Sequence, residues 1–284
     1  MFLHQAGFAV AKPRDIELED GTVIPILYED RSVLALDKPA GWLMVPSSWE
    51  KTARNLQLAL ESSINAGDFW AKSRNIKFLR FVHRLDADTS GTVLFVKSPG
   101  ATKAYSELFE SRKVEKLYLA IVQGVPAEVE WKCTLSIAPD LSLKGKMRVL
   151  RGKADIPEVK DAETHFRLLK SAEETSLIAG QPLTGRTHQI RVHLAACGYP
   201  VLGDPLYGPG KEASERLART LAPPRLTLKR GERLGLRAIA LAYPDPFTRK
   251  LIRIEAPFVE FVRSFGFEMG RDELFGPSKR RNKS

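Results

Sequence analysis

Two polar stretches of the chain carry side chains that could act as a base, as a nucleophile or as the ion-pair partner of one. The first, residues 81–96, has the sequence FVHRLDADTSGTVLFV. An apolar strand enters a polar corner and Gly91 begins a second apolar strand, so Asp86 lies at a strand end. A carboxylate held rigidly at the rim of a sheet can attack an electrophile or remove a proton. The residues between Asp86 and Gly91 are also turn formers, so a polar hairpin loop without catalysis is the alternative.

The second stretch, residues 183–198, has the sequence LTGRTHQIRVHLAACG. Its periodicity predicts a helix over 187–197 that stops at Gly198, with Thr184 or Thr187 capping the first turn. The apolar residues of this helix share one face, and the polar residues lie opposite.

The polar face of the predicted helix carries His188 and Arg191, three residues apart. An arginine removed from water needs an anionic partner, and Asp86 offers one. A zinc site on His188 and His193 is disfavoured, because a five-residue spacing splays the two rings apart and no third ligand is evident. We therefore expect no metal site.

A third stretch, residues 115–122, alternates polar and apolar residues and predicts a half-buried strand. Its Tyr118 is either a core aromatic with its hydroxyl in water or part of a site. Residues 38–41, Lys-Pro-Ala-Gly, form a turn after a strand and by themselves indicate no function.

The elements that must position these residues are mostly strands. Branched and aromatic residues predict strands at 23–27, 33–36, 78–82, 92–97, 117–122, 164–169, 175–179, 239–243 and 251–255. Helical periodicity occurs at 53–64, 102–112 and 187–197. Strands and helices do not alternate regularly, which disfavours a doubly wound parallel sheet or a barrel. The pattern predicts an α+β fold, a mixed sheet with peripheral helices.

The charge of the chain favours a polyanionic partner. Its 284 residues include 44 Lys and Arg against 34 Asp and Glu, a formal net charge of +10. The excess is concentrated in 141–160 and 211–233 and in the tail 277–284, whereas residues 1–37 are acidic. Each basic run alone could be no more than a solvated surface. Three separate runs indicate a shared role.

Composition also restricts the compartment and the domain plan. Two cysteines are too few for a zinc cage or a disulfide framework, which indicates a reducing compartment. No apolar run approaches the roughly 18 residues of a membrane span, and the amino terminus lacks signal-peptide features. We expect a cytoplasmic monomer without membrane contact. It would have an N-terminal extension at 1–19, a catalytic domain at 20–265 and a basic tail at 266–284.

Taken together, these stretches resemble the RluA-type pseudouridine synthases, which isomerise uridine within structured RNA. The resemblance is carried by DKPAG at 37–41, HRLD at 83–86 with TSG at 89–91, KLY at 116–118, TGRTHQIRVHL at 184–194 and GDP at 203–205. These motifs occur in the family's order and span about residues 25 to 257. The implied fold is a mixed, largely antiparallel sheet with peripheral helices and a central catalytic cleft.

The resemblance also implies roles for individual residues. Asp86 would be the essential aspartate, Tyr118 the tyrosine that lines the uracil pocket, and Arg191 the arginine that pairs with the aspartate. Arg84 would help to open the RNA helix and fill the space left by an extruded base. Further substrate-binding positions would be His83, Arg186, His188 and Gln189. One departure is Leu236-Arg237-Ala238 where relatives often have Leu-His-Ala, which would add a cation near the RNA face.

The implied activity is the isomerisation of specific uridines in ribosomal or transfer RNA to pseudouridine. No atoms enter or leave and no redox change occurs, so neither a metal nor an organic cofactor is needed. The basic runs would contact phosphates. The aspartate could attack the sugar, attack the uracil ring or remove a ribose proton, and the sequence does not choose among these routes. The alternatives are a non-catalytic RNA-binding or ribosome-assembly protein that retains the fold, and a glycoside hydrolase acting on nucleosides.

Overall fold

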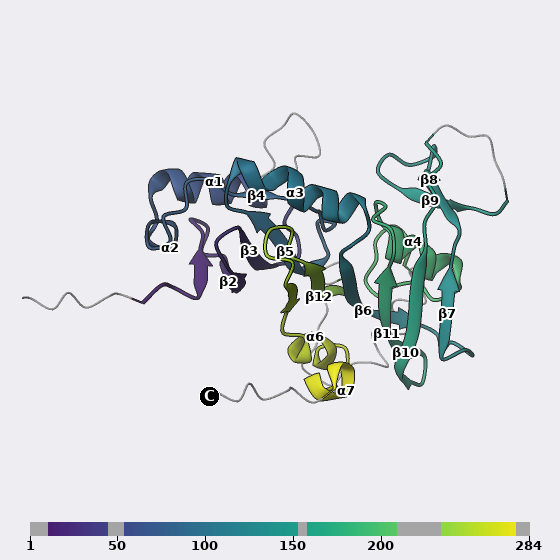
Figure 1. Ribbon diagram of the computed structural model, residues 1–284. Coiled ribbons are helices and arrows are strands. Elements are labelled where there is room, and N and C mark those ends of the chain that lie inside the picture. Colours follow the sequence, from purple (N-terminus) through teal and green to yellow (C-terminus); the bar gives the residue numbers. More distant parts are fainter. Residues whose placement is uncertain (1–10, 45–53, 153–157, 209–233, 277–284) are drawn as a thin grey trace, which may run out of the picture.

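The computed structural model describes residues 11–44, 54–152, 158–208 and 234–276 (Figure 1). The basic stretch 211–233 and the basic tail 277–284 lie outside the described residues, as does Lys153 of the stretch 141–160. The contacts with RNA expected of these segments therefore stay predictions.

Eleven of the thirteen described strands form one sheet that runs through the described part of the molecule. Its order is β1 (Asp15–Glu17), β2 (Val23–Glu29), β3 (Val33–Lys38), β5 (Ser90–Val96), β12 (Leu236–Pro244), β6 (Glu115–Gln123), β11 (Thr175–Pro182), β10 (Thr164–Ala172) and β7 (Glu130–Cys133). In addition, β4 (Arg80–Phe81) pairs with β5, and β13 (Leu251–Glu255) pairs with β12. Among the described strands, β5 and β12 alone are paired in parallel, so the sheet is mixed and largely antiparallel.

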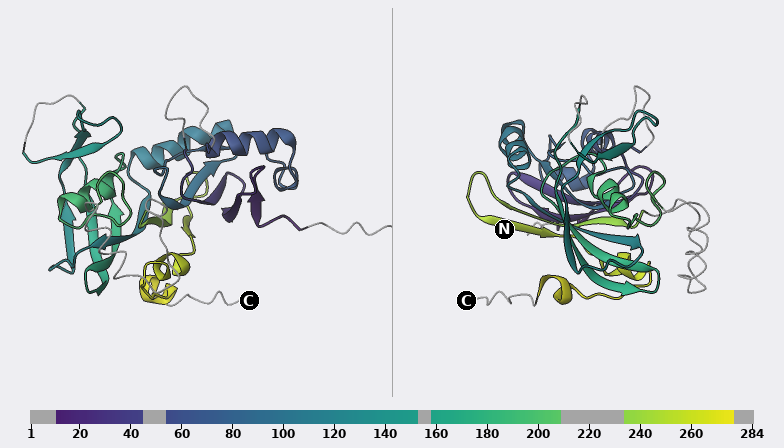
Figure 2. Two further views of the ribbon diagram at one scale, coloured as in Figure 1. Left: turned by 180° about the vertical axis from the view of Figure 1, so that it is seen from behind. Right: turned by 90° about the vertical axis from the view of Figure 1, so that its right-hand side faces the viewer.

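Helices cover both faces of the sheet. They are α1 (Leu56–Ala66), α2 (Phe69–Lys72), α3 (Pro99–Glu110), α4 (Gln189–Ala196), α6 (Val259–Arg263) and α7 (Arg271–Phe275). Because side chains alternate along a strand, Leu34 and Leu36 of β3 join the core beneath α1, whereas Val33 and Ala35 join the core beneath α3. The same alternation on β6 places Ala120 and Val122 under α4, and Leu119 and Ile121 under α6 (Figures 1 and 2).

A separate hairpin is built from β8 (Ser136–Pro139) and β9 (Met147–Leu150). This β8–β9 arm stands off the main sheet beside α4, as the front and rear views both show (Figures 1 and 2). It carries four of the five described cations of the basic stretch 141–160, namely Lys144, Lys146, Arg148 and Arg151, and the fifth, Lys160, forms a bridge to Ile137 of β8. Part of the predicted basic surface therefore lies on a projecting arm.

The predicted α+β fold is confirmed, and all nine predicted strands and the three predicted helices occur. Not predicted were the short elements β1, β7, β8, β9, α2, α6 and α7, each of three to five residues. Elements of this length are too short to show a hydrophobic period, and they form because the rest of the fold packs against them.

The folded unit extends further at both ends than the predicted domain 20–265. Ile16 of β1 is fully buried and lies within the segment predicted as an extension. Phe267 and Met269 are buried beneath the sheet, and the Phe275 ring meets that of Phe258 edge to face. Apolar side chains on both sides of the predicted boundaries at 19 and 266 therefore belong to the core, and the division into domains stays a prediction.

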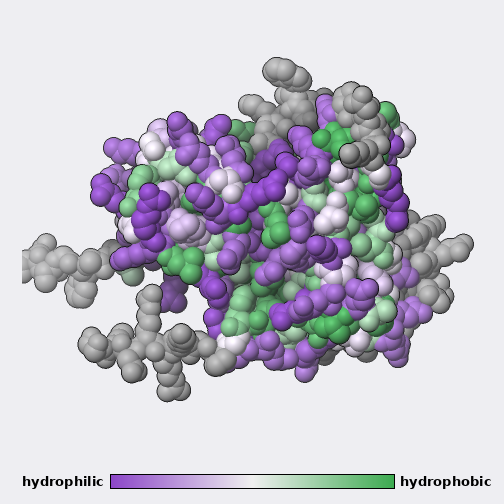
Figure 3. All heavy atoms as spheres, turned by 45° about the vertical axis from the view of Figure 1, so that its right-hand side comes forward, coloured by the Kyte–Doolittle hydropathy of each residue, from purple (hydrophilic) through white to green (hydrophobic). Residues whose placement is uncertain are grey.

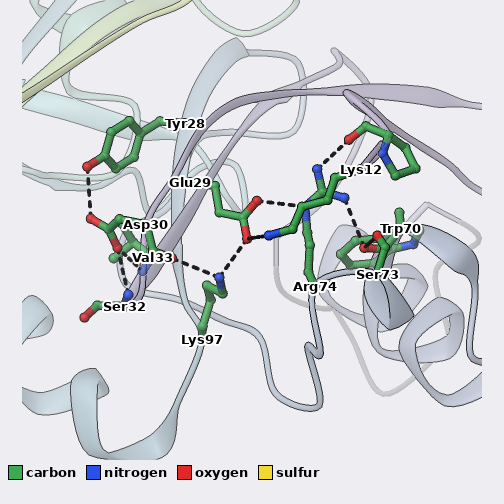
Figure 4. Close-up of polar contacts among 11 residues, drawn as sticks. Lys12, Tyr28, Glu29, Asp30, Ser32, Val33, Trp70, Ser73, Arg74 and Lys97 are labelled. Atoms are coloured by element: carbon green, nitrogen blue, oxygen red, sulfur yellow. Dashed lines mark hydrogen bonds and ion pairs between the residues drawn. The ribbon is translucent and has the colours of Figure 1, made fainter. Parts of the chain in front are cut away.

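An ion-pair network holds the first hairpin of the sheet against its neighbours (Figure 4). Glu29, the last residue of β2, lies 2.9 Å from Arg74 Nε and 2.9 Å from Lys97 Nζ. Burial alone would raise the pKa of Glu29, but its bonds to Lys97 and Arg74 outweigh that effect and lower it. Arg74 also donates to the carbonyl oxygens of Trp70 and Pro13. The network therefore ties β2 to α2 and to the end of β5.

The two halves of the sheet meet at the parallel contact between β5 and β12, where Gly91 lies opposite Ala238. Gly91 has φ +114°, which side chains rarely allow, and a Cβ atom there would lie 1.9 Å from the Ala238 carbonyl oxygen. The half that carries Asp86 and the half that carries Arg191 can approach this closely only because residue 91 has no side chain.

We expect Gly91→Ala to destabilise the protein by about 2 to 5 kcal/mol, because it combines backbone strain with overpacking. Urea unfolding measures the effect. The control is Gly100→Ala in α3, where nothing lies within 4 Å of the new methyl group. This control should stabilise by about 0.5 to 1 kcal/mol through helix propensity. Equal effects of the two substitutions would contradict the packing argument.

The surface is polar, in line with the charge of the chain. Figure 3 shows hydrophilic side chains over most of one face, with apolar residues in small, separated patches. None of the described helices combines the length and the apolar character that crossing a lipid bilayer requires.

Candidate active site

Asp86 lies in the loop that joins β4 to β5, and this loop is held from behind by a buried lysine. The side chain of Lys38 is fully buried and donates to the carbonyl oxygens of Ala87 at 2.7 Å and Pro39 at 2.9 Å. The Gly41 amide also donates to Ala87 O, at 2.9 Å. Burial lowers the pKa of Lys38 to about 7, although the nearby carboxylates oppose the shift. The turn at 38–41, which indicated no function in the sequence, thus fixes the backbone beside Asp86.

Arg191 joins two carboxylates at the floor of the site. Its Nη1 lies 3.2 Å from Asp86 Oδ2, while Nε and Nη2 contact Asp204 Oδ2 and Oδ1 at 2.7 and 2.8 Å. The side chains of Arg191 and Asp204 are 3% and 0% exposed, whereas that of Asp86 is 22% exposed. Burial alone would lower the pKa of Arg191, but Asp204 and then Asp86 raise it above its ordinary value. The arginine is therefore a fixed cation, and Asp86 is its solvent-facing partner.

Asp204 is the functional residue that sequence reasoning missed. It stands in the GDP motif at 203–205, yet the pattern assigned it no role. Its Oδ1 also accepts the backbone N–H groups of Leu206 at 2.9 Å and Tyr207 at 3.1 Å, which fixes its orientation. The available signal was chemical: a buried guanidinium carries five N–H donors, and one partly exposed carboxylate cannot satisfy them.

A cavity of about 720 Å³ opens above Asp86. All eight predicted site residues line it: His83, Arg84, Asp86, Tyr118, Arg186, His188, Gln189 and Arg191. Tyr118 of β6 is half-buried between the cores under α1 and α4. Burial, reinforced by the charge of Asp86, raises the pKa of Tyr118 above its ordinary value of 10, so its hydroxyl stays protonated.

Two of the predicted substrate-binding residues are already engaged within the protein. The Nε2 atom of His83 accepts the Leu94 amide at 3.0 Å, and its ring stacks on Phe109 with centroids 4.5 Å apart. Burial, with the charge of Lys116, lowers the pKa of His83 to about 3 and keeps it neutral. Gln189 is buried and its amide makes four internal hydrogen bonds, to Thr184, Arg186, Glu163 and Thr164. Both residues support the walls of the cavity.

The start of α4 differs from the expected threonine cap. The N-cap residue is His188, with φ 55°, and no described side chain caps the helix. Instead, Gln189 Oε1 accepts the Thr184 hydroxyl at 2.7 Å and the Arg186 amide at 2.9 Å, which closes the loop before the helix. The prediction of a cap at Thr184 or Thr187 is wrong because the helix begins at Gln189, which puts His188, in the αL conformation, at the N-cap position.

Arg237, the predicted extra cation, is engaged within the protein. Its Nη2 lies 2.6 Å from Asp37 Oδ2, and it also donates to Ser90 Oγ and Pro257 O. With both the charge and the donors satisfied internally, Arg237 bridges β3, β5 and β12 at the sheet junction.

The cavity rim is basic. Arg84, Arg112, Lys116 and Arg186 line the cavity, against Glu110 and Asp86. Lys116 Nζ donates to Thr184 O at 2.8 Å, and burial, followed by the charges of Arg112 and Arg186, lowers its pKa to about 8. Arg84 is exposed and has no ion-pair partner among the described residues. The neighbouring arginines contribute to the lowered pKa of Lys116, and such a cluster of cations favours binding of an anion. No group of three or more potential metal ligands occurs in the described part of the chain.

Comparison with known proteins identifies the family. The model of the RNA pseudouridylate synthase family matches residues 32–196, which include Asp86 and Arg191. The chain belongs to the RNA pseudouridylate synthase family. An uncharacterized RNA pseudouridine synthase of Zymomonas mobilis is 38% identical over 69% of this chain and 83% of its own length.

Two further relatives place the chain in the RluA type of this family. The dual-specificity RNA pseudouridine synthase RluA of Vibrio cholerae is 32% identical over 68% of this chain and 73% of its own. The ribosomal large subunit pseudouridine synthase C of Yersinia pestis is 34% identical over 84% of this chain and 67% of its own length. The solved structure of human RNA pseudouridylate synthase domain containing 4 has a TM-score of 0.66 at 24% identity, covering 86% of this chain and 94% of its own, and shows the shared fold.

In this pseudouridine synthase fold, we expect Asp204→Asn to weaken both stability and turnover. The substitution leaves a buried guanidinium without its bidentate partner, which costs about 3 kcal/mol or more. Urea unfolding and single-turnover kinetics measure the two effects. The control is Glu260→Gln, which breaks an exposed pair with Arg263 and should change stability by less than about 1 kcal/mol. If Asp204→Asn behaved like this control, Asp204 would not be the anchor of Arg191.

Proposed function

We propose that this chain converts specific uridines of ribosomal or transfer RNA to pseudouridine, with Asp86 acting on a flipped-out uridine. The proposal rests on one observation: the carboxylate of Asp86 lines the open cavity and is paired with a buried arginine beneath it. The name of the Yersinia relative specifies the large ribosomal subunit, and that of the Vibrio relative specifies dual specificity for RNA, which supports ribosomal RNA and a second kind of RNA as substrates. Such a role places the protein in the cytoplasm.

The geometry leaves one carboxylate oxygen for the substrate. Asp86 Oδ2 takes Arg191 at 3.2 Å and faces His188 Nε2 at 4.0 Å, whereas Oδ1 has no partner among the described residues. Oδ1 is thus the atom available to attack the sugar or the ring, or to take a proton. The reaction breaks the bond from N1 to the ribose, turns the base within the cavity and joins C5 to the same carbon. The C5 proton leaves and N1 gains one, so atoms balance without a cofactor.

The base must first leave its stack, which costs a few kcal/mol and less in loops or single strands. Tyr118 is placed to offset part of this cost, since stacking of a base on an aromatic ring contributes about 1 to 3 kcal/mol. Arg84 is exposed at the cavity mouth, where it can fill the space of the extruded base. The basic rim would then hold the flanking phosphates.

We expect Asp86→Asn to lower single-turnover isomerisation by at least about 10³-fold while RNA affinity stays within a few-fold, because an amide cannot serve as nucleophile or base. Carbodiimide mapping of pseudouridine in total RNA, with and without the gene, identifies the substrate. The matched control is Asp88→Asn, an exposed carboxylate in the same loop, which should retain activity.

Three outcomes would count against the proposal. Normal turnover by Asp86→Asn would remove the aspartate from its role. Release of free uracil would indicate a glycoside hydrolase. RNA binding by the wild-type protein, with no site lost from the map on gene deletion, would indicate a non-catalytic RNA-binding protein.

Lys116 makes RNA affinity depend on pH. It is charged below its pKa of about 8 and loses that charge above it. The KM for substrate RNA should therefore rise between pH 7 and 9, by roughly the contribution of one phosphate contact. Lys116→Met should raise KM at pH 7 and flatten this part of the profile, whereas Lys116→Arg should keep a low KM to higher pH. If KM of Lys116→Met still rose with pH as in the wild type, Lys116 would not be the cause of that rise.

A further inference from the structure

A chain of polar contacts leads from the β8–β9 arm to Asp86 through two aromatic side chains. The Met147 amide of β9 donates to Tyr207 Oη at 2.7 Å. Tyr207 Oη lies 2.9 Å from His188 Nδ1, and His188 Nε2 lies 4.0 Å from Asp86 Oδ2. This series of contacts thus connects a backbone group of the β8–β9 arm with the carboxylate of Asp86.

The direction of these bonds favours one tautomer of His188. The Met147 N–H can only donate, so Tyr207 Oη accepts it with one lone pair and still has a proton to donate. Among the described residues, the acceptor within reach of that proton is His188 Nδ1. When Tyr207 donates to Nδ1, the ring proton of a neutral His188 is on Nε2, the atom that faces Asp86.

His188 is neutral at physiological pH because burial lowers its pKa. The carboxylates of Asp86, Asp204 and Asp88 oppose this shift, and the charge of Arg191 reinforces it. A neutral imidazole with Nε2–H presents a donor to Asp86 without adding a second full charge beside Arg191.

We propose that His188 is a positioning residue for Asp86 and that Tyr207 sets its tautomer. The 4.0 Å separation is that of a substrate-free site, in which catalytic hydrogen bonds are often long and shorten in the reactive complex. Two donors at Oδ2, Arg191 Nη1 and His188 Nε2–H, would restrain rotation of the carboxylate and leave Oδ1 for the substrate. The effect on turnover rests on the function proposed above.

Tyr207 contacts Arg191, His188 and Asp204, so this one residue supports the side chains around Asp86. Its ring packs over the Arg191 guanidinium at 5.3 Å and meets the His188 ring edge to face at 5.6 Å. Its amide donates to Asp204 at 3.1 Å. On the arm side, Lys146 Nζ lies 5.9 Å from the same ring. His188 also adopts φ 55°, a conformation that costs a non-glycine residue about 1 kcal/mol or more and is retained where function requires it.

The test combines nitrogen NMR of the histidine rings with single-turnover kinetics. In the wild-type protein, the His188 signals should show an unprotonated, hydrogen-bonded Nδ1 and a protonated Nε2. Tyr207→Phe keeps the ring against Arg191 but removes the hydroxyl, so the Nδ1 signal should lose its hydrogen-bond shift. Turnover should fall about tenfold, the equivalent of one lost hydrogen bond, with KM for RNA unchanged.

A second pair of variants tests the donor itself. Gln at position 188 can place an amide N–H near the position of Nε2, whereas Leu cannot. His188→Gln should therefore retain at least about fivefold more turnover than His188→Leu, a difference expected from one hydrogen bond. The control is Tyr28→Phe, which removes a part-buried hydroxyl bonded to Asp30 at 3.0 Å, away from the site, and should leave kinetics and histidine signals unchanged.

Each contrary result overturns the proposal. A wild-type His188 protonated on Nδ1 removes the tautomer assignment, and this measurement requires no variant and no activity. Wild-type turnover in Tyr207→Phe, or equal turnover in His188→Gln and His188→Leu, removes the positioning role. A rise in KM with unchanged kcat makes His188 a substrate contact instead. If the wild-type protein modified no RNA, the proposed function would be wrong, whereas the NMR assignment of the His188 tautomer would be unaffected.

Discussion

The site depends on a buried guanidinium shared by two carboxylates. Taking Arg191 out of water is unfavourable unless its donors are satisfied, and Asp204 does this with two bonds from a fully buried position. Only Nη1 then remains directed at Asp86, at 3.2 Å. The two acids differ because of burial: the buried acid neutralises and orients the arginine, whereas the partly exposed acid, Asp86, remains open to the cavity. A single Asp–Arg pair would have had to do both.

This arrangement requires two halves of one sheet to meet accurately. Asp86 comes from the β4–β5 loop in one half, whereas Arg191 and Asp204 follow β11 in the other. The halves join where β5 runs parallel to β12, at the close approach of Gly91 to Ala238. A shift at that junction would move the carboxylate relative to the arginine, so packing far from the cavity determines its geometry. The further bond from Lys38 to Ala87 holds the backbone next to Asp86 in place.

Cations serve different purposes in this protein, and the distinction matters for RNA binding. Arg74, Lys97 and Arg237 are engaged by internal carboxylates and stabilise strand and helix contacts. Arg84, Arg112, Lys116 and Arg186 instead line the cavity, where Lys116 has its pKa lowered by burial and by its neighbours. A net charge of +10 counts both kinds alike. Surplus charge therefore indicates a polyanion but does not say which residues meet it.

The sequence by itself determined the fold class, nine of the thirteen described strands, the three longest described helices and eight residues that line the cavity, because hydrophobic period and long motifs are local in the chain. Tertiary structure alone decided the rest. Asp204 as anchor, Lys38 as loop support, Arg237 as an internal bridge and the αL turn at His188 all depend on groups brought together from distant positions. Whether a charged side chain faces water or a buried partner is a property of packing, and no spacing along the chain encodes it.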